Sequence, residues 1–272
     1  SFIQYVRNFT QPIQQVAQVT NMLQLAAASS ERVFEFLEEK EEDQTVEHPV
    51  SVEGLHGNVQ FENVHFGYNP EKIIINDFSA NVKEGQKIAI VGPTGAGKTT
   101  LINLLMRFYE LNDGKIMLDG IDTRDMTRSN LRNNFGMVLQ DTWLFGGTIA
   151  ENISYSKPDA TYEQIVAAAK AARVDFFVRT MSHGYDTVLS NDAENISIGQ
   201  RQLLTIARVF LCDPAVIILD EATSSVDTRT EIEIGKAMKA LMKNRTSFVI
   251  AHRLSTIIDA DLILFMQNGN II

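Results

Sequence analysis

Residues 92–99 read Gly-Pro-Thr-Gly-Ala-Gly-Lys-Thr and fit the pattern G-x-x-x-x-G-K-[ST] of a phosphate-binding loop. The mostly apolar residues 87–91 before it are typical of a short buried strand, and residues 100–106 continue at helical spacing. Glycines let successive backbone N–H groups face an anion, and the start of the helix adds the positive end of its dipole. In this pattern Lys98 bridges the outer phosphates and the Thr99 hydroxyl binds magnesium. The alternative is a glycine-rich turn without a ligand, and the presence of both Lys98 and Thr99 argues against it.

The bulk composition limits the class of protein. With 272 residues the chain can form one large domain or two small ones. Its formal charge of −10 argues against a nucleic-acid partner, because such proteins generally present a basic face. The single Cys212 lies in an apolar run and is best explained as a core residue, so a disulfide framework is excluded. No run of about 18 apolar residues is present to span a bilayer. The chain lacks an initiator methionine and a leader, and we expect a fragment cut at both ends.

Residues 1 to about 43 carry apolar side chains at a helical repeat that is interrupted by Pro12. The repeat ends in the acidic cluster 38–43. We expect one long helix followed by a linker. An ordinary surface helix is the alternative, but a helix of this length has no partner within its own segment, which favours partner helices outside this chain.

The globular part begins near Asn58, where the pattern changes to the alternation of a strand, and a second strand follows at 73–82. Tyr68 then stands at a strand exit, either as a half-buried sheet residue or as an exposed aromatic. Residues 141 to about 205 are mainly helical in pattern and suggest an insertion or subdomain. Ser197 and Gly199 stand at the start of its last helix, where either a second anion site or a plain N-cap is possible.

Several apolar runs are followed directly by polar residues. Asp220 and Glu221 follow the most apolar run of the chain, Gln140 follows residues 135–139, and His252 follows residues 247–251. Two carboxylates at the end of a buried strand are costly unless they bind a cation or take part in proton transfer. In parallel sheets ligands bind beyond the carboxyl ends of the strands. We therefore expect phosphate, metal and proton chemistry at one edge of a sheet.

Taken together, these features resemble the ATP-binding cassette (ABC) family, specifically the nucleotide-binding domain of an exporter half. The resemblance covers residues 1 to 272 and rests on seven motifs in order: the aromatic Tyr68, the phosphate loop 92–99, the Q-loop Gln140, the signature 195–202, the Walker B end 219–221, the D-loop 224–227 and the switch His252. It implies an α/β fold, a P-loop NTPase of ABC type with a mixed sheet core, an antiparallel β subdomain and a helical signature subdomain at about 141–205. It also implies that residues 1–48 are the cytoplasmic extension of the last membrane helix plus a linker, and that 58–272 are the nucleotide-binding domain, truncated at its C-terminus.

The resemblance further implies an ATPase in which two such domains close head to tail around two ATP molecules. Magnesium would be held by Thr99, Gln140 and Asp220. Glu221 would polarise the attacking water, while His252 and Gln140 complete the catalytic set. The nucleotide would be contacted by Tyr68, Gly92, Pro93, Thr94, Gly95, Ala96, Gly97, Lys98, Thr99, Thr100 and Asp227, and by Ser197, Gly199 and Gln200 of the partner's signature.

The sequence departs from the family pattern around the signature. Ile196 replaces the usual leucine before Ser197, and Ile198 stands where a small or polar residue is usual. Residues 187–194 also differ from the stretch common in homodimeric exporters, which favours a heterodimer. We expect ATP-driven export at the cytoplasmic face of the cell membrane, with a second nucleotide-binding domain and the chain's own membrane domain as partners. The alternatives are a soluble ABC-type ATPase not coupled to transport and a subunit that binds nucleotide without hydrolysing it.

Overall fold

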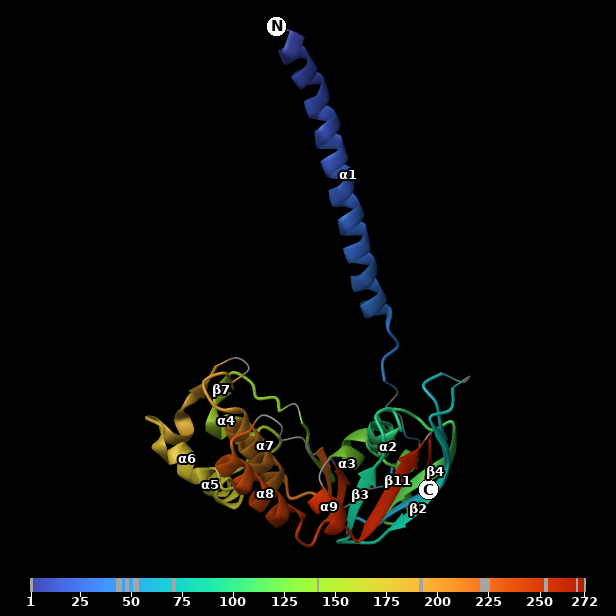
Figure 1. The fold of residues 1–272 in the computed structure, drawn as a ribbon, viewed down its shortest axis with the longest axis vertical. Coiled ribbons are helices and arrows are strands. Elements are labelled where there is room, and N and C mark those ends of the chain that lie inside the picture. The colour runs from blue at the N-terminus through green and yellow to red at the C-terminus, as the bar shows by residue number, and fades with distance from the viewer. Residues whose placement is uncertain are drawn as a thin grey trace. The chain divides into compact units, whose positions relative to one another are not determined.

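The computed structural model describes residues 2–42, 46, 49–50, 54–69, 72–140, 142–190, 193–220, 226–251, 254–267 and 269–271. The chain divides into two compact units, Ser1–Thr45 and Val46–Ile272 (Figure 1).

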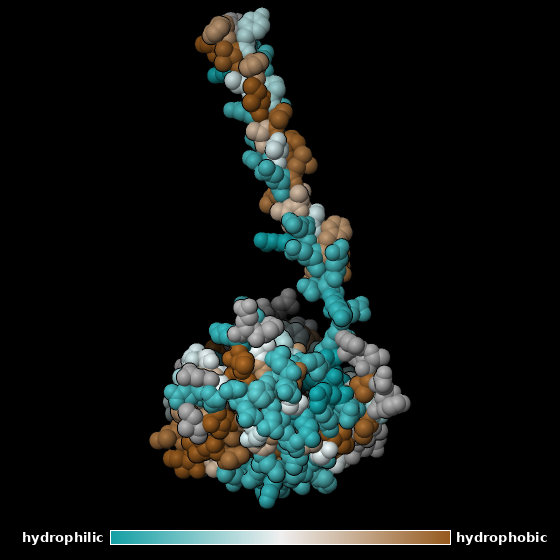
Figure 2. Space-filling model, turned by 90° about the vertical axis from the view of Figure 1, so that its right-hand side faces the viewer, coloured by the Kyte–Doolittle hydropathy of each residue, from teal (hydrophilic) through white to brown (hydrophobic). Residues whose placement is uncertain are grey.

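The first unit contains one long helix, α1 (Phe2–Glu38), and all of its residues are exposed. The helix continues through Pro12, so the interruption expected there does not end it. Proline lacks an N–H and removes one backbone hydrogen bond from the helix, which the remaining turns tolerate. Apolar side chains occur along the whole length of α1 (Figure 2). They include Phe2, Val6, Phe9, Ile13, Val16, Leu23, Val33, Phe34 and Leu37. None of the described helices is both long and apolar enough to cross a bilayer.

The second unit is built on a six-stranded sheet with the order β12-β11-β3-β10-β9-β6. Five of these strands are parallel, and only β12 pairs in the antiparallel sense. The strands are β3 (Lys87–Val91), β6 (Phe135–Val138), β9 (Val216–Asp220), β10 (Thr246–Ile250), β11 (Leu262–Gln267) and β12 (Asn270–Ile271). The residues of β3, β6, β9 and β10 are largely buried because both faces of the sheet are covered there, whereas Ile263 and Phe265 on β11 are exposed.

A four-stranded antiparallel sheet packs on one face of the parallel sheet. Its order is β2-β1-β4-β5, with β1 (Val59–Phe66), β2 (Ile75–Val82), β4 (Asp113–Leu118) and β5 (Ile121–Asp122). The helix α2 (Lys98–Leu105) shares this core. Phe61 of β1 and Phe248 of β10 contact each other edge to face, with ring centroids 6.3 Å apart. Strand β2 begins at Ile75, two residues after the start at residue 73 that the apolar pattern predicts.

Helices cover the other face of the parallel sheet and gather at one end of the unit (Figure 1). They include α4 (Ile149–Ser154), α5 (Tyr162–Ala171), α6 (Asp175–Thr180), α7 (Ile198–Cys212) and α8 (Thr228–Met242). Shorter elements complete the unit: η1 (Thr123–Asp125), α3 (Arg128–Arg132), η2 (Gly184–Asp186), α9 (Leu254–Ile258), and a sheet of β7 (Gly147–Thr148) with β8 (Val188–Leu189). This small sheet was not expected from the sequence. The α/β class with antiparallel and helical parts is confirmed.

Strand β9 contributes to two hydrophobic cores. Ile217 and Leu219 belong to the core beneath the helices, whereas Val216 and Ile218 belong to the core beneath the antiparallel sheet. This alternation follows from the two-residue period of a strand. The parallel sheet therefore stands between the two cores and supports both parts of the unit.

The entry into β1 is fixed by the carboxylate of Asp119 in the turn between β4 and β5. Its oxygens accept hydrogen bonds from the backbone N–H groups of His56 (2.7 Å), Gly57 (3.0 Å) and Asn58 (2.9 Å), and from the Asn58 side chain (2.6 Å). Asp119 and Gly120 both have positive φ (49° and 81°), which suits a two-residue hairpin turn. Partial burial acts to raise the pKa of Asp119, but the hydrogen bonds from Asn58, Gly57 and His56 outweigh it and lower the pKa from its usual 3.8.

We expect Asp119→Asn to destabilise the fold by about 1 kcal/mol at neutral pH, because the N–H groups of His56, Gly57 and Asn58 lose a charged acceptor. The effect is no larger because solvent partly screens that charge. Asparagine tolerates the positive φ, so backbone strain does not contribute. A carboxylate with a lowered pKa stabilises the folded state above its unfolded pKa and stops doing so as the pH falls through its folded pKa. The difference between the two proteins should therefore narrow below about pH 4. Urea unfolding from pH 3 to 8 measures it, and a constant difference would contradict this role.

Candidate functional site

The carboxyl ends of four neighbouring parallel strands meet at one edge of the sheet. In the register, Ile250 of β10 lies beside Ile90 of β3 and beside Asp220 of β9, and Val138 of β6 lies beside Leu219. The phosphate-loop sequence follows β3, and Gln140 lies two residues beyond β6 with an exposed side chain. The structure thus brings the loop, Gln140 and Asp220 to the same edge. Glu221, Ser224, Ser225 and His252 lie outside the described residues, although Glu221 directly follows β9 in sequence.

The loop between β3 and α2 has the backbone of an anion-binding turn. Gly92, Gly95 and Gly97 have positive φ values of 151°, 80° and 99°. Gly97 is the N-cap of α2 and has no side chain to satisfy the first N–H groups of that helix. The ammonium of Lys98 donates to the carbonyl oxygens of Gly92 (2.8 Å) and Pro93 (3.0 Å). The loop therefore holds a cation and a row of N–H donors beside a helix N-terminus, as phosphate binding requires.

The first glycine of the loop is closely packed against β11. A Cβ atom added at Gly92 would lie 2.2 Å from the carbonyl oxygen of Met266 and 3.3 Å from the Cβ of Ala96. At Gly95 an added Cβ would meet nothing within 4 Å. Gly92 is thus required for the fit of the loop to the sheet, whereas Gly95 is required only for its backbone angle.

Tyr68 lies two residues beyond the end of β1 and is 50% exposed. Its hydroxyl lies 3.3 Å from the hydroxyl of Thr100 on α2, and its ring contacts Phe66 and Tyr109 edge to face, with centroids 5.0 and 4.9 Å away. The aromatic ring is therefore fixed beside the helix that follows the phosphate loop and keeps half of its surface in solvent.

Ser197 is the N-cap of α7 and forms a capping box with Gln200. The Ser197 hydroxyl accepts from the Gln200 N–H (3.3 Å), and the Gln200 side chain accepts from the Ser197 N–H (2.9 Å). An added Cβ at Gly199 would lie 2.3 Å from the Thr230 side chain and 2.8 Å from that of Val226. Asp227 caps α8, where it accepts from the Thr230 N–H at 3.0 Å. The hydrogen bonds from Thr230 lower the pKa of Asp227.

Comparison with known proteins identifies the family. Residues 75–224, more than half of the chain, match the sequence profile of the ABC transporter family. The chain belongs to this family. It is 56% identical over 272 residues to a fatty acid ABC transporter ATP-binding/permease protein of Mycobacterium bovis, covering 100% of this chain and 43% of that protein. It is 45% identical over 261 residues to an ATP-dependent lipid A-core flippase of Desulfotalea psychrophila, covering 96% of this chain and 46% of that protein.

A solved structure of a bacterial Atm1-family ABC exporter with ATP bound superposes with a TM-score of 0.79. The two chains are 36% identical, and the match covers 98% of this chain and 47% of that one. This ABC transporter chain therefore spans less than half the length of these relatives. The resemblance to an ABC exporter is confirmed.

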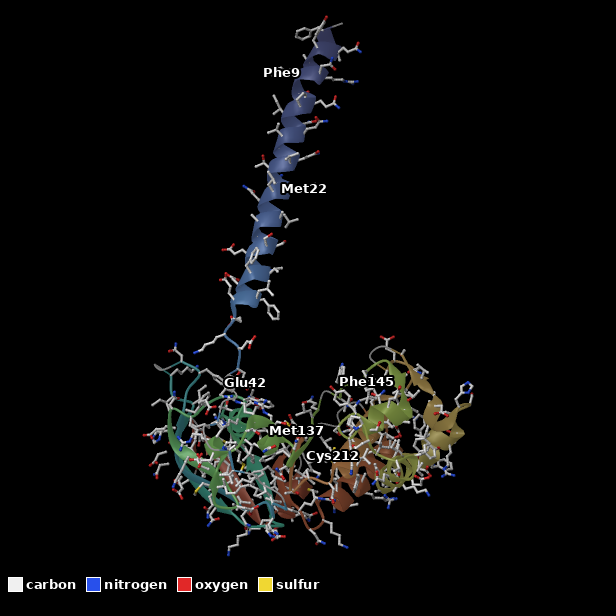
Figure 3. All side chains as sticks on the ribbon, turned by 180° about the vertical axis from the view of Figure 1, so that it is seen from behind. Phe9, Met22, Glu42, Met137, Phe145 and Cys212 are labelled. Carbon is white, nitrogen blue, oxygen red and sulfur yellow. The ribbon has the colours of Figure 1, made fainter. Side chains whose placement is uncertain are left out.

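In this ABC transporter chain residues of β6 and α7 line a groove of about 280 Å³ close to Gln140. Met137 and Cys212 line it from these two elements (Figure 3). Two exposed aromatic residues, Trp143 and Tyr155, form its rim with ring centroids 5.9 Å apart. Phe145 contacts both rings at centroid distances of 6.1 and 5.5 Å.

Sequence reasoning missed two polar residues at this groove, Arg208, which lines it, and Asn152, which is hydrogen-bonded to Arg208. Asn152 is fully buried on α4, and Arg208 is half-buried on α7. Arg208 stands between the apolar residues Ala207 and Val209, and a charged side chain within such a run is the signal that could have found it. Asn152 follows Glu151 on a mixed helix, and its sequence carries no such signal.

Proposed function

We propose that this chain binds and hydrolyses ATP as the nucleotide-binding part of an ABC exporter. The observation that carries the proposal is the phosphate loop at the same sheet edge as Gln140 and Asp220. Hydrolysis needs a phosphate cradle, a cation site and a positioned water, and parallel strands deliver these groups to one edge.

Lys98 and the loop amides would hold the phosphates of ATP. The Lys98 ammonium already lies inside the loop on two carbonyl oxygens, and an anionic phosphate is a stronger acceptor than either. We assign the neighbouring contacts to Gly92, Pro93, Thr94, Gly95, Ala96, Gly97, Thr99 and Thr100.

Thr99, Gln140 and Asp220 would hold Mg²⁺. A hydroxyl, an amide oxygen and a carboxylate form the hard oxygen set that this ion prefers together with water and phosphate. When bound, the ion neutralises phosphate charge.

Glu221 would polarise the attacking water, and His252 would contact the γ-phosphate and support that water. Glu221 follows β9 and His252 follows β10 by two residues, so the chain supplies both at the edge that holds the loop. A carboxylate directly after the Asp220 position is suited to general-base work beside a cation.

A second nucleotide-binding domain would complete each site. Ser197, Gly199 and Gln200 would contact the γ-phosphate of ATP held by the partner chain, and Asp227 would lie near that interface. The first backbone hydrogen bond of α7 runs from Arg201 to Ser197, so the N–H groups of Ile198 and Gly199 precede it and remain available to an anion. The departure of residues 187–194 from the stretch common in homodimeric exporters favours a heterodimer.

The chain's own membrane domain would be the second partner. This chain would then lie at the cytoplasmic face of the cell membrane. The apolar residues of α1 are exposed and need cover, and the aromatic rim of Trp143 and Tyr155 offers a docking surface beside Gln140. Because that surface adjoins the cation site, docking there would couple ATP binding to movement of the membrane helices.

The proposal is tested by the magnesium-dependent ATPase rate of the purified chain over a wide range of protein concentration, with Glu221→Gln as the blank. A rate that rises with the square of concentration supports hydrolysis by a dimer of this chain. Tight ATP binding with no rate above the blank, even after candidate partner domains are added, would instead identify a subunit that binds nucleotide without hydrolysing it.

We expect Tyr68→Ala to weaken ATP binding by about 5- to 150-fold, corresponding to about 1–3 kcal/mol for aromatic–base stacking. The half-exposed ring beside α2 motivates this expectation. Titration with a fluorescent ATP analogue measures the dissociation constant. Tyr68→Phe keeps the ring and loses only the contact with Thr100, so it should stay within about threefold of wild type. An unaltered constant for Tyr68→Ala would make Tyr68 a sheet residue only.

A further inference from the structure

We propose that Arg208 is a positioning residue that ties the segment following Gln140 to the signature helix α7, so that a displacement of that segment moves Ser197. The inference rests on the proposed function, because the moved group is the one assigned to the partner's ATP. It concerns a residue outside the sheet edge and outside the nucleotide contacts described above.

The Arg208 guanidinium reaches three oxygen atoms on two separate segments. Its Nη1 donates to the carbonyl oxygen of Trp143 at 2.8 Å, three residues beyond Gln140. Its Nε and Nη2 donate to the carbonyl and side-chain oxygens of Asn152 at 2.5 and 2.7 Å. The guanidinium also lies 5.3 Å from the ring centroid of Tyr155. One side chain of α7 therefore fixes both α4 and the segment at the groove rim.

Asn152 extends this connection to the rest of the segment. Its side-chain oxygen accepts from the Phe145 N–H (3.1 Å), and its amide donates to the carbonyl oxygens of Phe145 (3.0 Å) and Thr148 (3.1 Å). Because the same oxygen also accepts from Arg208, the two side chains form one continuous network. The network is partly buried, with the bond to Trp143 at its exposed end. Such a network favours one backbone arrangement, since losing a partner leaves the buried members unsatisfied.

Packing alone does not account for an arginine at this position. Its three acceptors are uncharged, and burial lowers the pKa of Arg208 to about 10, which still leaves it charged at neutral pH. Most buried α7 residues near it are apolar, for example Leu204, Val209 and Leu211, and the one polar exception, Thr205, is uncharged. An apolar residue would fill the space without desolvating a charge. What an apolar side chain cannot supply is a planar group that bonds several oxygens at fixed angles.

The helix α7 carries the connection to the signature. Ser197 caps its first turn, and Arg208 lies eleven residues further on, which corresponds to about 16 Å along a helix axis. Leu203, Leu204, Ile206 and Ala207 are buried between the two residues, so this length of helix is held as one rigid rod. A shift at Trp143 is thereby transmitted to the N-terminus of α7.

The test compares Arg208→Met and Arg208→Lys in the full chain with Arg179→Met, which removes an exposed ion pair with Asp175 on α6 (3.0 Å) and serves as the matched control. We expect Arg208→Met to leave the ATP dissociation constant within about twofold and to lower kcat by about 10- to 100-fold, as misplacement of a reacting group does. Arg208→Lys keeps the charge and one donor group, so its kcat should lie between that of Arg208→Met and that of wild type. Arg179→Met should match wild type.

The melting temperature is measured in parallel, and all rates are taken well below it. A kcat of Arg208→Met within about twofold of wild type would overturn the proposal. So would a loss of kcat and of ATP binding in the same proportion as the folded fraction, which is the signature of a purely structural role.

The chain could bind ATP and yet show no ATPase rate above that of Glu221→Gln, which would contradict only hydrolysis by this chain alone. In that case hydrogen exchange tests the role of Arg208. We expect ATP to change the protection of residues 143–148 and 197–200 together in wild type, and that of 143–148 alone in Arg208→Met. Identical changes in both proteins would overturn the coupling. A wild-type chain that does not bind ATP at all would remove the proposed function and this inference with it.

Discussion

Replacement of Glu221 by Gln is expected to lower ATP turnover by about 10²–10⁴ while ATP binding is preserved. Glutamine has nearly the same shape as glutamate but cannot accept a proton from the attacking water. The loop amides, Lys98 and Asp220 are untouched by the change, so the phosphates should still be held. Turnover is measured by phosphate release and binding by titration with a fluorescent ATP analogue.

Glu163→Gln is the control for Glu221→Gln, because Glu163 is an exposed carboxylate on α5 and has no part in the proposed site. It should leave turnover unchanged. Unchanged turnover in Glu221→Gln as well would remove Glu221 from the mechanism. A loss of ATP binding would assign it to the ground-state site instead.

Gly92→Ala is expected to abolish detectable ATP binding and to destabilise the fold by about 3 kcal/mol or more. The added Cβ would lie 2.2 Å from the Met266 carbonyl oxygen, at a φ of 151° that side chains rarely adopt. Because the obstacle is backbone of β11, neither the loop nor the strand can make room by a change of rotamer. Urea unfolding and nucleotide titration measure the two effects.

Gly95→Ala provides the matched comparison within the same loop. Gly95 has a φ of 80° and open space around an added Cβ, so only the backbone strain of about 1 kcal/mol applies. It should bind ATP more weakly than wild type but far better than Gly92→Ala. Equal effects of the two substitutions would mean that the contact with β11 does not shape the loop.

The sheet and its edge could be predicted because the signals are local. Short apolar runs predicted the parallel strands β3, β6, β9 and β10, whereas β11 was not predicted. The residue types at 92–99 specify a loop whose chemistry depends on backbone N–H groups. The ABC family motifs then gave the order of the parts. The ends of the elements were predicted less well. Strand β6 ends at Val138, two residues before Gln140. Helix α1 continues through Pro12, because one missing hydrogen bond costs less than breaking a long helix.

The contacts that join distant segments could not be predicted. The pairing of β7 with β8 joins residues about forty apart, and the reach of Arg208 to Trp143 spans 65 positions. No periodicity encodes such contacts, since they depend on how helices pack after folding. The same holds for Gly199, whose lack of a side chain is explained only by Val226 and Thr230 of a later segment.

The alternation along β9 has a consequence for how this domain can be divided. If the helical part were excised, Ile217 and Leu219 of β9 and Val249 of β10 would lose their cover and face water. The remaining strands would then present a one-sided apolar surface instead of a buried sheet. The helical part is therefore no detachable module, and the two halves should melt in a single transition.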